Sequence, residues 1–185
     1  KTEELFAKAK DFMRDLGKEK KQVLFVSGKN EALETIKDSA VSISMPYVSG
    51  RWIGGTLTNF SVIRQRVDLL ISQKDKRDKG EFAKYTKKER VLLDREIAKM
   101  ETMFSGLVAM KSLPSAVFIV DTGREKVVVA EARKVSIPVI ALMNSDCDFK
   151  SADYPIVGND SSQASIKYFV REIVGAYKEG LSQAK

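Results

Sequence analysis

Four short, almost uninterrupted apolar runs constrain the fold of this chain more than any other feature. Their side chains do not alternate with polar ones, so we expect strands buried on both faces, as in a parallel sheet covered by helices. Between them, apolar residues recur at the spacing of amphipathic helices. The runs are residues 23–26, 116–120, 137–142 and 154–157, with a weaker fifth at 43–48; the helical segments are 2–16, 30–40, 125–135 and 162–177. The alternation predicts a doubly wound α/β core with a parallel sheet.

The middle of the chain, residues 59–110, contains no candidate strand. Its apolar residues repeat with the steps of a heptad, which predicts two antiparallel helices packed as a coiled coil. Thr86 and Glu89 have the spacing of a capping box, so the second helix should begin there. We therefore predict an α/β core of residues 1–58 and 111–185 with a helical hairpin inserted at 59–110. The predicted seam packs Phe60, Ile63, Val67 and Leu70 against Leu93, Ile97, Met100, Phe104 and Leu107.

The composition narrows the possible functions. Lys and Arg outnumber Asp and Glu by 32 to 25, for a net charge of +7, which favours a polyanionic partner such as a nucleic acid. The absence of His removes the commonest general base and most zinc sites. Cys147 is the single cysteine, so neither an internal disulfide nor a thiolate cluster can form. No apolar run has the roughly 20 residues of a membrane span. We expect no cofactor, no metal, no membrane and no small-molecule substrate.

An enzyme or nucleotide-binding module is the alternative from another functional class. Lys29 follows a strand and opens a helix, but a second glycine and the Gly-Lys-Ser/Thr of a phosphate loop are missing, so it could instead meet an RNA phosphate. Several aspartates follow predicted strands, where α/β proteins place ligand sites. No base or nucleophile accompanies them, and aspartate is also common in turns; Asn159-Asp160 is most simply a helix cap. These aspartates are Asp121, Asp146, Asp148, Asp153 and Asp160.

The segment that joins the two predicted hairpin helices is rich in cations. A run of charges is usually only a solvated surface, but Phe82 and Tyr85 are interleaved here and the segment lies at the end of a projection. We therefore expect contact with RNA or protein. The cations are Lys74, Lys76, Arg77, Lys79, Lys84, Lys87, Lys88 and Arg90.

The stretch Arg-Trp-Ile-Gly-Gly-Thr-Leu-Thr-Asn-Phe at residues 51–60 identifies a family. It resembles the signature of the bacterial-type second protein of the small ribosomal subunit, as do Thr-Lys-Lys-Glu at 86–89 and Asp-Tyr-Pro-Ile with Gly-Asn-Asp at 153–160. Glu131-Ala132 and Cys147-Asp148 match as well, and the resemblance covers essentially the whole chain in order. Asn144 and Ser161 stand where the family commonly has Asp, and its paired histidines are absent, which argues against a metal at Asp146, Asp148 or Asp160.

The resemblance implies a flavodoxin-like three-layer core with an inserted hairpin, and a missing segment before Lys1. It implies a non-catalytic, structural constituent of the small subunit, located in the cytoplasm on the ribosome. The implied partners are ribosomal RNA and neighbouring ribosomal proteins, including the large mRNA-binding one; a protein-docking scaffold is thus a third hypothesis beside RNA binding.

The signature stretch also has a physical interpretation. Gly54 and Gly55 allow positive φ, Thr58 or Asn59 can cap the first hairpin helix, and Trp52 is expected to wedge the hairpin against the core rather than stack on a base. The candidate RNA contacts in the chain are Lys29, Arg51, Thr56, Thr58, Asn59, Arg64, Lys74, Lys76, Arg77, Lys84, Lys87 and Lys88.

Overall fold

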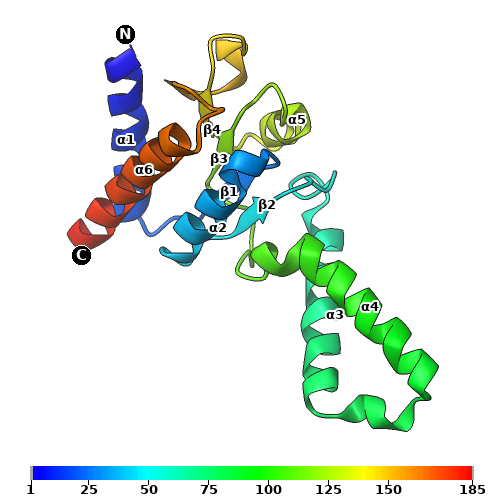
Figure 1. Ribbon diagram of the computed structural model, residues 1–185. Helices are drawn as coiled ribbons and strands as arrows, with labels where there is room; N and C mark the ends of the chain where they lie inside the picture. Colours follow the sequence, from blue (N-terminus) through cyan, green and yellow to red (C-terminus); the bar gives the residue numbers. More distant parts are fainter. Residues whose placement is uncertain (1, 185) are drawn as a thin grey trace.

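A five-stranded sheet with helices on both faces forms the core of the computed structural model, which describes residues 2–184 (Figure 1). The strands are β1 (Val23–Ser27), β2 (Tyr47–Ser49), β3 (Ala116–Val120), β4 (Val139–Met143) and β5 (Tyr154–Val157). The α-helices are α1 (Thr2–Lys18), α2 (Leu33–Val41), α3 (Phe60–Asp78), α4 (Lys87–Phe104), α5 (Lys126–Lys134) and α6 (Gln163–Gln183). Short 3₁₀ turns are η1 (Asn30–Ala32), η2 (Glu81–Lys84), η3 (Ser105–Leu107) and η4 (Phe149–Ser151).

All paired strands are parallel, in the order β2-β1-β3-β4-β5. This is the flavodoxin-like order, in which the chain reverses its direction across the sheet between β1 and β3. The predicted parallel α/β core is therefore confirmed. The weak fifth run was placed wrongly: Ser44 has a φ of 56° in a turn, so the strand begins only at Tyr47.

The strands are buried on both faces because their side chains alternate between two apolar clusters. Phe25 and Phe118 point to the face covered by α1, α2 and α6. Val26 and Ile119 point to the other face, which α5 and the loop before α3 cover. A continuous apolar run thus serves two helical layers at once, which is why it shows no alternation in sequence.

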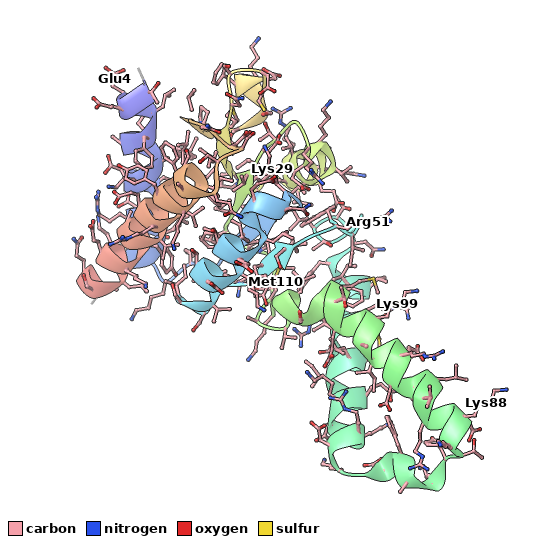
Figure 2. The ribbon with its side chains drawn as sticks, viewed as in Figure 1. Glu4, Lys29, Arg51, Lys88, Lys99 and Met110 are labelled. Carbon is pink, nitrogen blue, oxygen red and sulfur yellow. The ribbon has the colours of Figure 1, made fainter. Side chains whose placement is uncertain are left out.

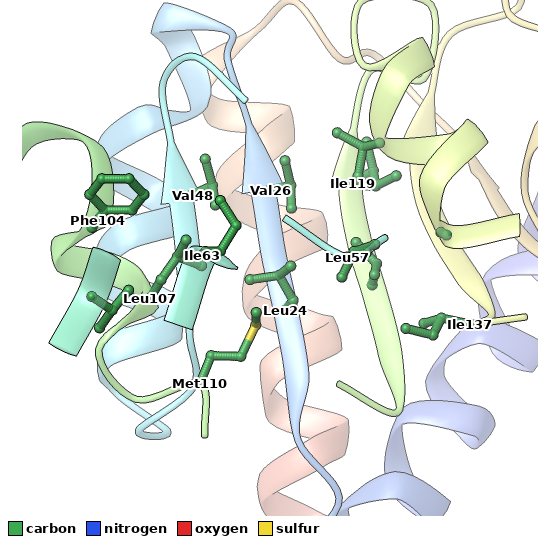
Figure 3. Packing of buried hydrophobic residues seen from close by; sticks show 14 of the residues in the cluster. Leu24, Val26, Val48, Leu57, Ile63, Phe104, Leu107, Met110, Ile119 and Ile137 are labelled. Atoms are coloured by element: carbon green, nitrogen blue, oxygen red, sulfur yellow. The ribbon is translucent and has the colours of Figure 1, made fainter. Parts of the chain in front are cut away.

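Helices α3 and α4 project from the core as a hairpin (Figure 1). Ile63, Val67 and Leu70 of α3 and Ile97, Met100 and Phe104 of α4 are buried in the same cluster, as the heptad spacing predicted. Figure 3 shows that this cluster continues into the sheet, since Phe104 and Leu107 lie beside Val48. Because the buried cluster crosses the proposed boundaries, the division at residues 59 and 110 stays a prediction.

Candidate nucleic-acid interface

The loop that carries the signature stretch folds around one buried carboxylate. Glu131 of α5 is 8% exposed and accepts five hydrogen bonds from residues 52–58. Its Oε1 accepts from Trp52 Nε1 at 3.0 Å and from the Gly55 N–H at 2.7 Å. Its Oε2 accepts from the Leu57 N–H at 3.0 Å and from the N–H and Oγ1 of Thr58, each at 3.2 Å. The loop is thereby fixed to the core immediately before α3 begins.

These hydrogen bonds decide the charge state of Glu131. Burial by itself raises the pKa of this carboxyl, but the hydrogen bonds from Trp52, Gly55, Leu57 and Thr58 outweigh it and hold the pKa below its ordinary value. The carboxylate is therefore ionised at neutral pH and serves as a fixed acceptor for the loop. Sequence reasoning missed this role. The available signal was an acidic residue on the apolar face of a helix, beside Val128 and Ala132.

The Glu131 contacts correct several expectations about the loop. Thr58 does not cap α3, because its hydroxyl donates to Glu131; Asn59 is the N-cap residue, but its side chain makes no capping bond. Gly55 has a φ of 90° as expected, whereas Gly54 has no positive φ. Trp52 packs against the buried cluster shared by the hairpin and the sheet, as the wedge interpretation predicted.

Lys29 lies at the carboxyl end of β1 and is occupied within the protein. Its Nζ donates to Asp160 at 2.9 Å, to Asp121 at 3.1 Å and to Ser161 at 3.2 Å. Burial lowers the pKa of this ammonium, but the bonds to Asp160 and Asp121 outweigh the effect and raise the pKa. The Lys29 ammonium is thus bound by carboxylates and is not presented to a phosphate. The expectation that Asn159-Asp160 caps α6 is also wrong, since the N-cap residue is Ser162 and Asp160 pairs with Lys29.

The same cluster answers the question of metal ligation. Single oxygen or sulfur atoms of Asp121, Cys147 and Asp160 lie within 4.8 Å of one another. Two of these three groups already bind Lys29, whose ammonium offsets part of their negative charge. The arrangement of the described residues therefore fits an internal ion cluster better than a site for a divalent ion.

Two of the other aspartates support the backbone, whereas Asp146 accepts from Cys147 Sγ at 3.6 Å. Asp153 accepts from the Val139 N–H at 2.8 Å, and Asp148 caps η4 by accepting from the Lys150 N–H at 3.0 Å. Before α6, Asn159 accepts from the N–H groups of Ser161 and Ser162. These polar side chains thus accept hydrogen bonds from backbone N–H groups in turns, as aspartate and asparagine commonly do.

The hairpin is built as the sequence predicted at its second helix. Thr86 accepts from the Glu89 N–H at 3.4 Å, and Glu89 accepts from the Thr86 N–H at 2.9 Å, so the capping box is complete. Lys74 of α3 pairs with Glu101 of α4 at 2.8 Å. Near the core, Arg64 donates to the carbonyl groups of Val108 and Met110, each at 3.2 Å.

The structure therefore divides ten of the twelve candidate RNA contacts into two groups, with Arg77 and Asn59 between them. The first group is occupied within the protein: Thr56 is fully buried and donates to the Ile53 carbonyl, and the others in this group are Lys29, Thr58, Arg64 and Lys74. Arg77 pairs weakly with Asp78 at 3.5 Å, and Asn59 is the N-cap residue of α3. The second group is exposed, with no ion pair among the described residues: Arg51, Lys76, Lys84, Lys87 and Lys88.

The exposed group lies in two places. Lys76, Lys84, Lys87 and Lys88 form what we call the tip patch, at the distal end of the hairpin. Arg51 lies at the core, and Figure 2 shows it far along the molecule from Lys88. The hairpin thus carries positive charge away from the α/β core, where it is accessible to a polyanion.

Comparison with known proteins decides the family. The family model described as ribosomal protein S2 matches residues 1–180. The chain belongs to the ribosomal protein S2 family. Among its relatives, small ribosomal subunit protein uS2 of Helicobacter acinonychis (strain Sheeba) is 40% identical over 180 residues, which cover 97% of this chain and 73% of the relative. The uS2 protein of Wolinella succinogenes is 41% identical over 184 residues, covering 100% of this chain and 68% of the relative.

Membership of the ribosomal protein S2 family confirms the resemblance seen in the signature stretch and sets aside the enzyme alternative. The family has a structural ribosomal role and is not catalytic. Among residues 2–184, no helix combines the length and the apolar character needed to cross a bilayer.

Proposed function

We propose that this chain is a structural constituent of the small ribosomal subunit that binds ribosomal RNA through its tip patch and Arg51. The observation that carries the proposal is the division of the cations. Of the candidate cations, Lys29, Arg64 and Lys74 are occupied by acids or carbonyl groups. The four tip-patch lysines are exposed instead and have no ion pair among the described residues. The relatives named small ribosomal subunit protein uS2 support ribosomal RNA as the anion.

The chemistry of the tip favours recognition of phosphate and RNA shape over reading of bases. The tip patch consists of lysine ammonium groups, which attract phosphates without regard to sequence. Phe82 is buried at 8% exposure and supports the tip from within, so only Tyr85 of the two interleaved aromatics is available to stack on a base. Lys84 already lies 5.5 Å from the Tyr85 ring centroid.

A salt titration of binding to small-subunit ribosomal RNA tests the proposal. With five cations on phosphates, each contributing about 0.7–0.9 to the log–log slope, affinity should fall roughly a few hundred-fold between about 50 and 200 mM salt. Lys87→Gln with Lys88→Gln should weaken binding and reduce the slope by about 1.5. The matched control, Lys37→Gln with Lys178→Gln, removes two exposed lysines from α2 and α6. If both double variants weakened binding equally, or if the affinity did not depend on salt concentration, the tip patch would not be the RNA-binding surface.

We further propose that the protein contacts neighbouring small-subunit proteins, including the large mRNA-binding one. Support comes from the family resemblance together with exposed apolar side chains on the hairpin, namely Val91, Leu92 and Met103 of α4. Co-sedimentation with small subunits depleted of this protein, followed by addition of the mRNA-binding protein, measures the contact. If the mRNA-binding protein joined the depleted subunits equally well with and without this chain, the contact would be ruled out.

A further inference from the structure

A hollow opens where the carboxyl ends of β1, β2 and β3 meet. Its volume is about 630 Å³, and it is lined by residues that follow these three strands. The chain turns from β1 to β2 on one side of the sheet and continues to β3 on the other, so the hollow lies at the topological switch point. Open α/β sheets bind ligands at this position. The residues that line the hollow include Gly28, Gly50, Arg51, Trp52, Arg124 and Glu125.

The walls of this switch-point hollow are fixed by hydrogen bonds between segments. The Gly28 N–H donates to Glu125 Oε1 at 2.8 Å, and the Gly50 N–H donates to the Ser27 carbonyl at 2.8 Å. A side chain at residue 28 would place its Cβ 2.7 Å from Glu125 Oε1 and 3.0 Å from the Gly50 carbonyl oxygen. Glycine at residue 28 leaves room for this close approach, and a larger residue would have to displace the Glu125 carboxylate. The hollow is preformed, which lowers the entropic cost of binding.

The charged groups that line the hollow are two arginines and one buried acid. Arg51 follows β2 and Arg124 follows β3; both are exposed, and within residues 2–184 neither guanidinium has a hydrogen bond or ion pair. Glu125 is 6% exposed, and its Oε1 is already bound by the Gly28 N–H. This differs from Lys29 nearby, whose ammonium is bound by two carboxylates. Unpaired guanidinium groups are the preferred partners of phosphate because they can donate two parallel hydrogen bonds.

We propose that the switch-point hollow binds a phosphate group in an unpaired stretch of ribosomal RNA, held by Arg51 and Arg124. A duplex backbone is convex and stiff, whereas an unpaired nucleotide can enter a concave site. The volume lies within the range of about 300–1,000 Å³ typical of small-molecule sites, which accommodates a nucleotide. Trp52 also lines the hollow and is the only tryptophan of the chain, so its fluorescence reports occupancy. This inference rests on the proposed RNA-binding function and adds Arg124 to it.

The test compares three double variants for affinity to small-subunit ribosomal RNA and for the change in Trp52 fluorescence on binding. Arg51→Gln with Arg124→Gln should lose about 10-fold in affinity and lose the fluorescence change. Lys87→Gln with Lys88→Gln should lose affinity but retain the fluorescence change, because the tip patch is remote from Trp52. Lys37→Gln with Lys178→Gln controls for the loss of two charges.

The outcomes separate this inference from the proposed function. If the unmodified chain does not bind ribosomal RNA, both fail. If it binds, and the arginine variant matches the Lys37/Lys178 control in affinity and fluorescence, the hollow is not an RNA site although the protein still binds RNA. AMP supplies the same phosphate chemistry as a free ligand. We expect micromolar AMP to cause no saturable change in Trp52 fluorescence. Micromolar AMP binding that the arginine variant abolishes would assign the hollow to a free nucleotide and overturn the RNA proposal.

Discussion

Replacing Glu131 by Gln tests whether one carboxylate holds the signature loop to the core. The substitution keeps the size of the side chain but turns one of the two oxygens into an NH₂ group, which cannot accept a hydrogen bond. If the NH₂ group takes the Oε1 position, Trp52 Nε1 and the Gly55 N–H lose their acceptor. If it takes the Oε2 position, the N–H groups of Leu57 and Thr58 lose theirs, while the Thr58 hydroxyl can rotate to accept. Either orientation leaves two N–H donors facing another donor.

The expected loss of stability follows from those two donors. A buried donor without an acceptor costs about 1–3 kcal/mol, and water relieves part of the cost at the rim of the loop, so we expect a loss of about 3 kcal/mol in the free energy of unfolding. At about 2–4 °C for each kcal/mol in a domain of this size, the melting temperature should fall by roughly 6–12 °C.

Urea unfolding near neutral pH, followed by Trp52 fluorescence and by circular dichroism, measures the effect. Trp52 donates directly to Glu131, so its emission in the folded state should also change. Glu31→Gln is the control, because Glu31 is exposed and no hydrogen bond of its side chain is seen in the described part of the chain. If Glu131→Gln unfolds within about 0.5 kcal/mol of the unmodified chain, the carboxylate does not hold the loop and the reasoning is wrong.

Three further predictions follow from the same contacts. The folded-state pKa of Glu131 is lowered below its ordinary value near 4.5, so its stabilisation is present above that value and is lost as pH falls through the folded-state pKa; melting temperatures of the unmodified chain and Glu131→Gln should therefore differ at neutral pH and converge only as the pH falls below about 4.5. Gly106→Ala should lower the melting temperature, because a Cβ there would lie 2.1 Å from the Tyr47 carbonyl oxygen, whereas Gly54→Ala, which meets open space, should not. Ile97→Asp buries an unpaired charge in the hairpin seam and should remove amide protection across α3 and α4 while the sheet amides stay protected; hydrogen exchange measures this, and global unfolding would refute a separable hairpin.

The helices and strands were predictable because burial on one or two faces gives apolar residues a characteristic spacing in the sequence. The run at 116–120 coincides with β3, and the heptad steps identified α3 and α4, because both patterns are local in the chain. The capping box at Thr86 was equally local, with donor and acceptor three residues apart. β2 was misplaced because Ile43 is buried in a turn after α2, and apolar content alone does not distinguish a buried turn from a strand.

The site was less predictable because its contacts join residues that lie far apart in the chain. Glu131 binds a loop more than 70 residues earlier, and Lys29 binds Asp160 from 131 residues away. No sequence period reports such pairs. Lys29 was therefore interpreted as a candidate for phosphate, and Thr58 as a helix cap, although both are bound by carboxylates within the protein. Arg124 was overlooked because it follows a strand alone, without a motif around it.

The insertion of α3 and α4 between β2 and β3 has a consequence for how the chain assembles during synthesis. Val23 of β1 pairs in register with Ala116 of β3, so one edge of a buried apolar strand has no partner until roughly 90 further residues are made. At about 5–20 residues per second, this wait lasts on the order of 5–20 s, during which an open strand edge invites aggregation. The hairpin shortens the effective separation, because its own contacts are local and its folding brings the two ends of the insertion together. The hairpin, which projects from the folded protein, thus also shortens the long connection between β2 and β3.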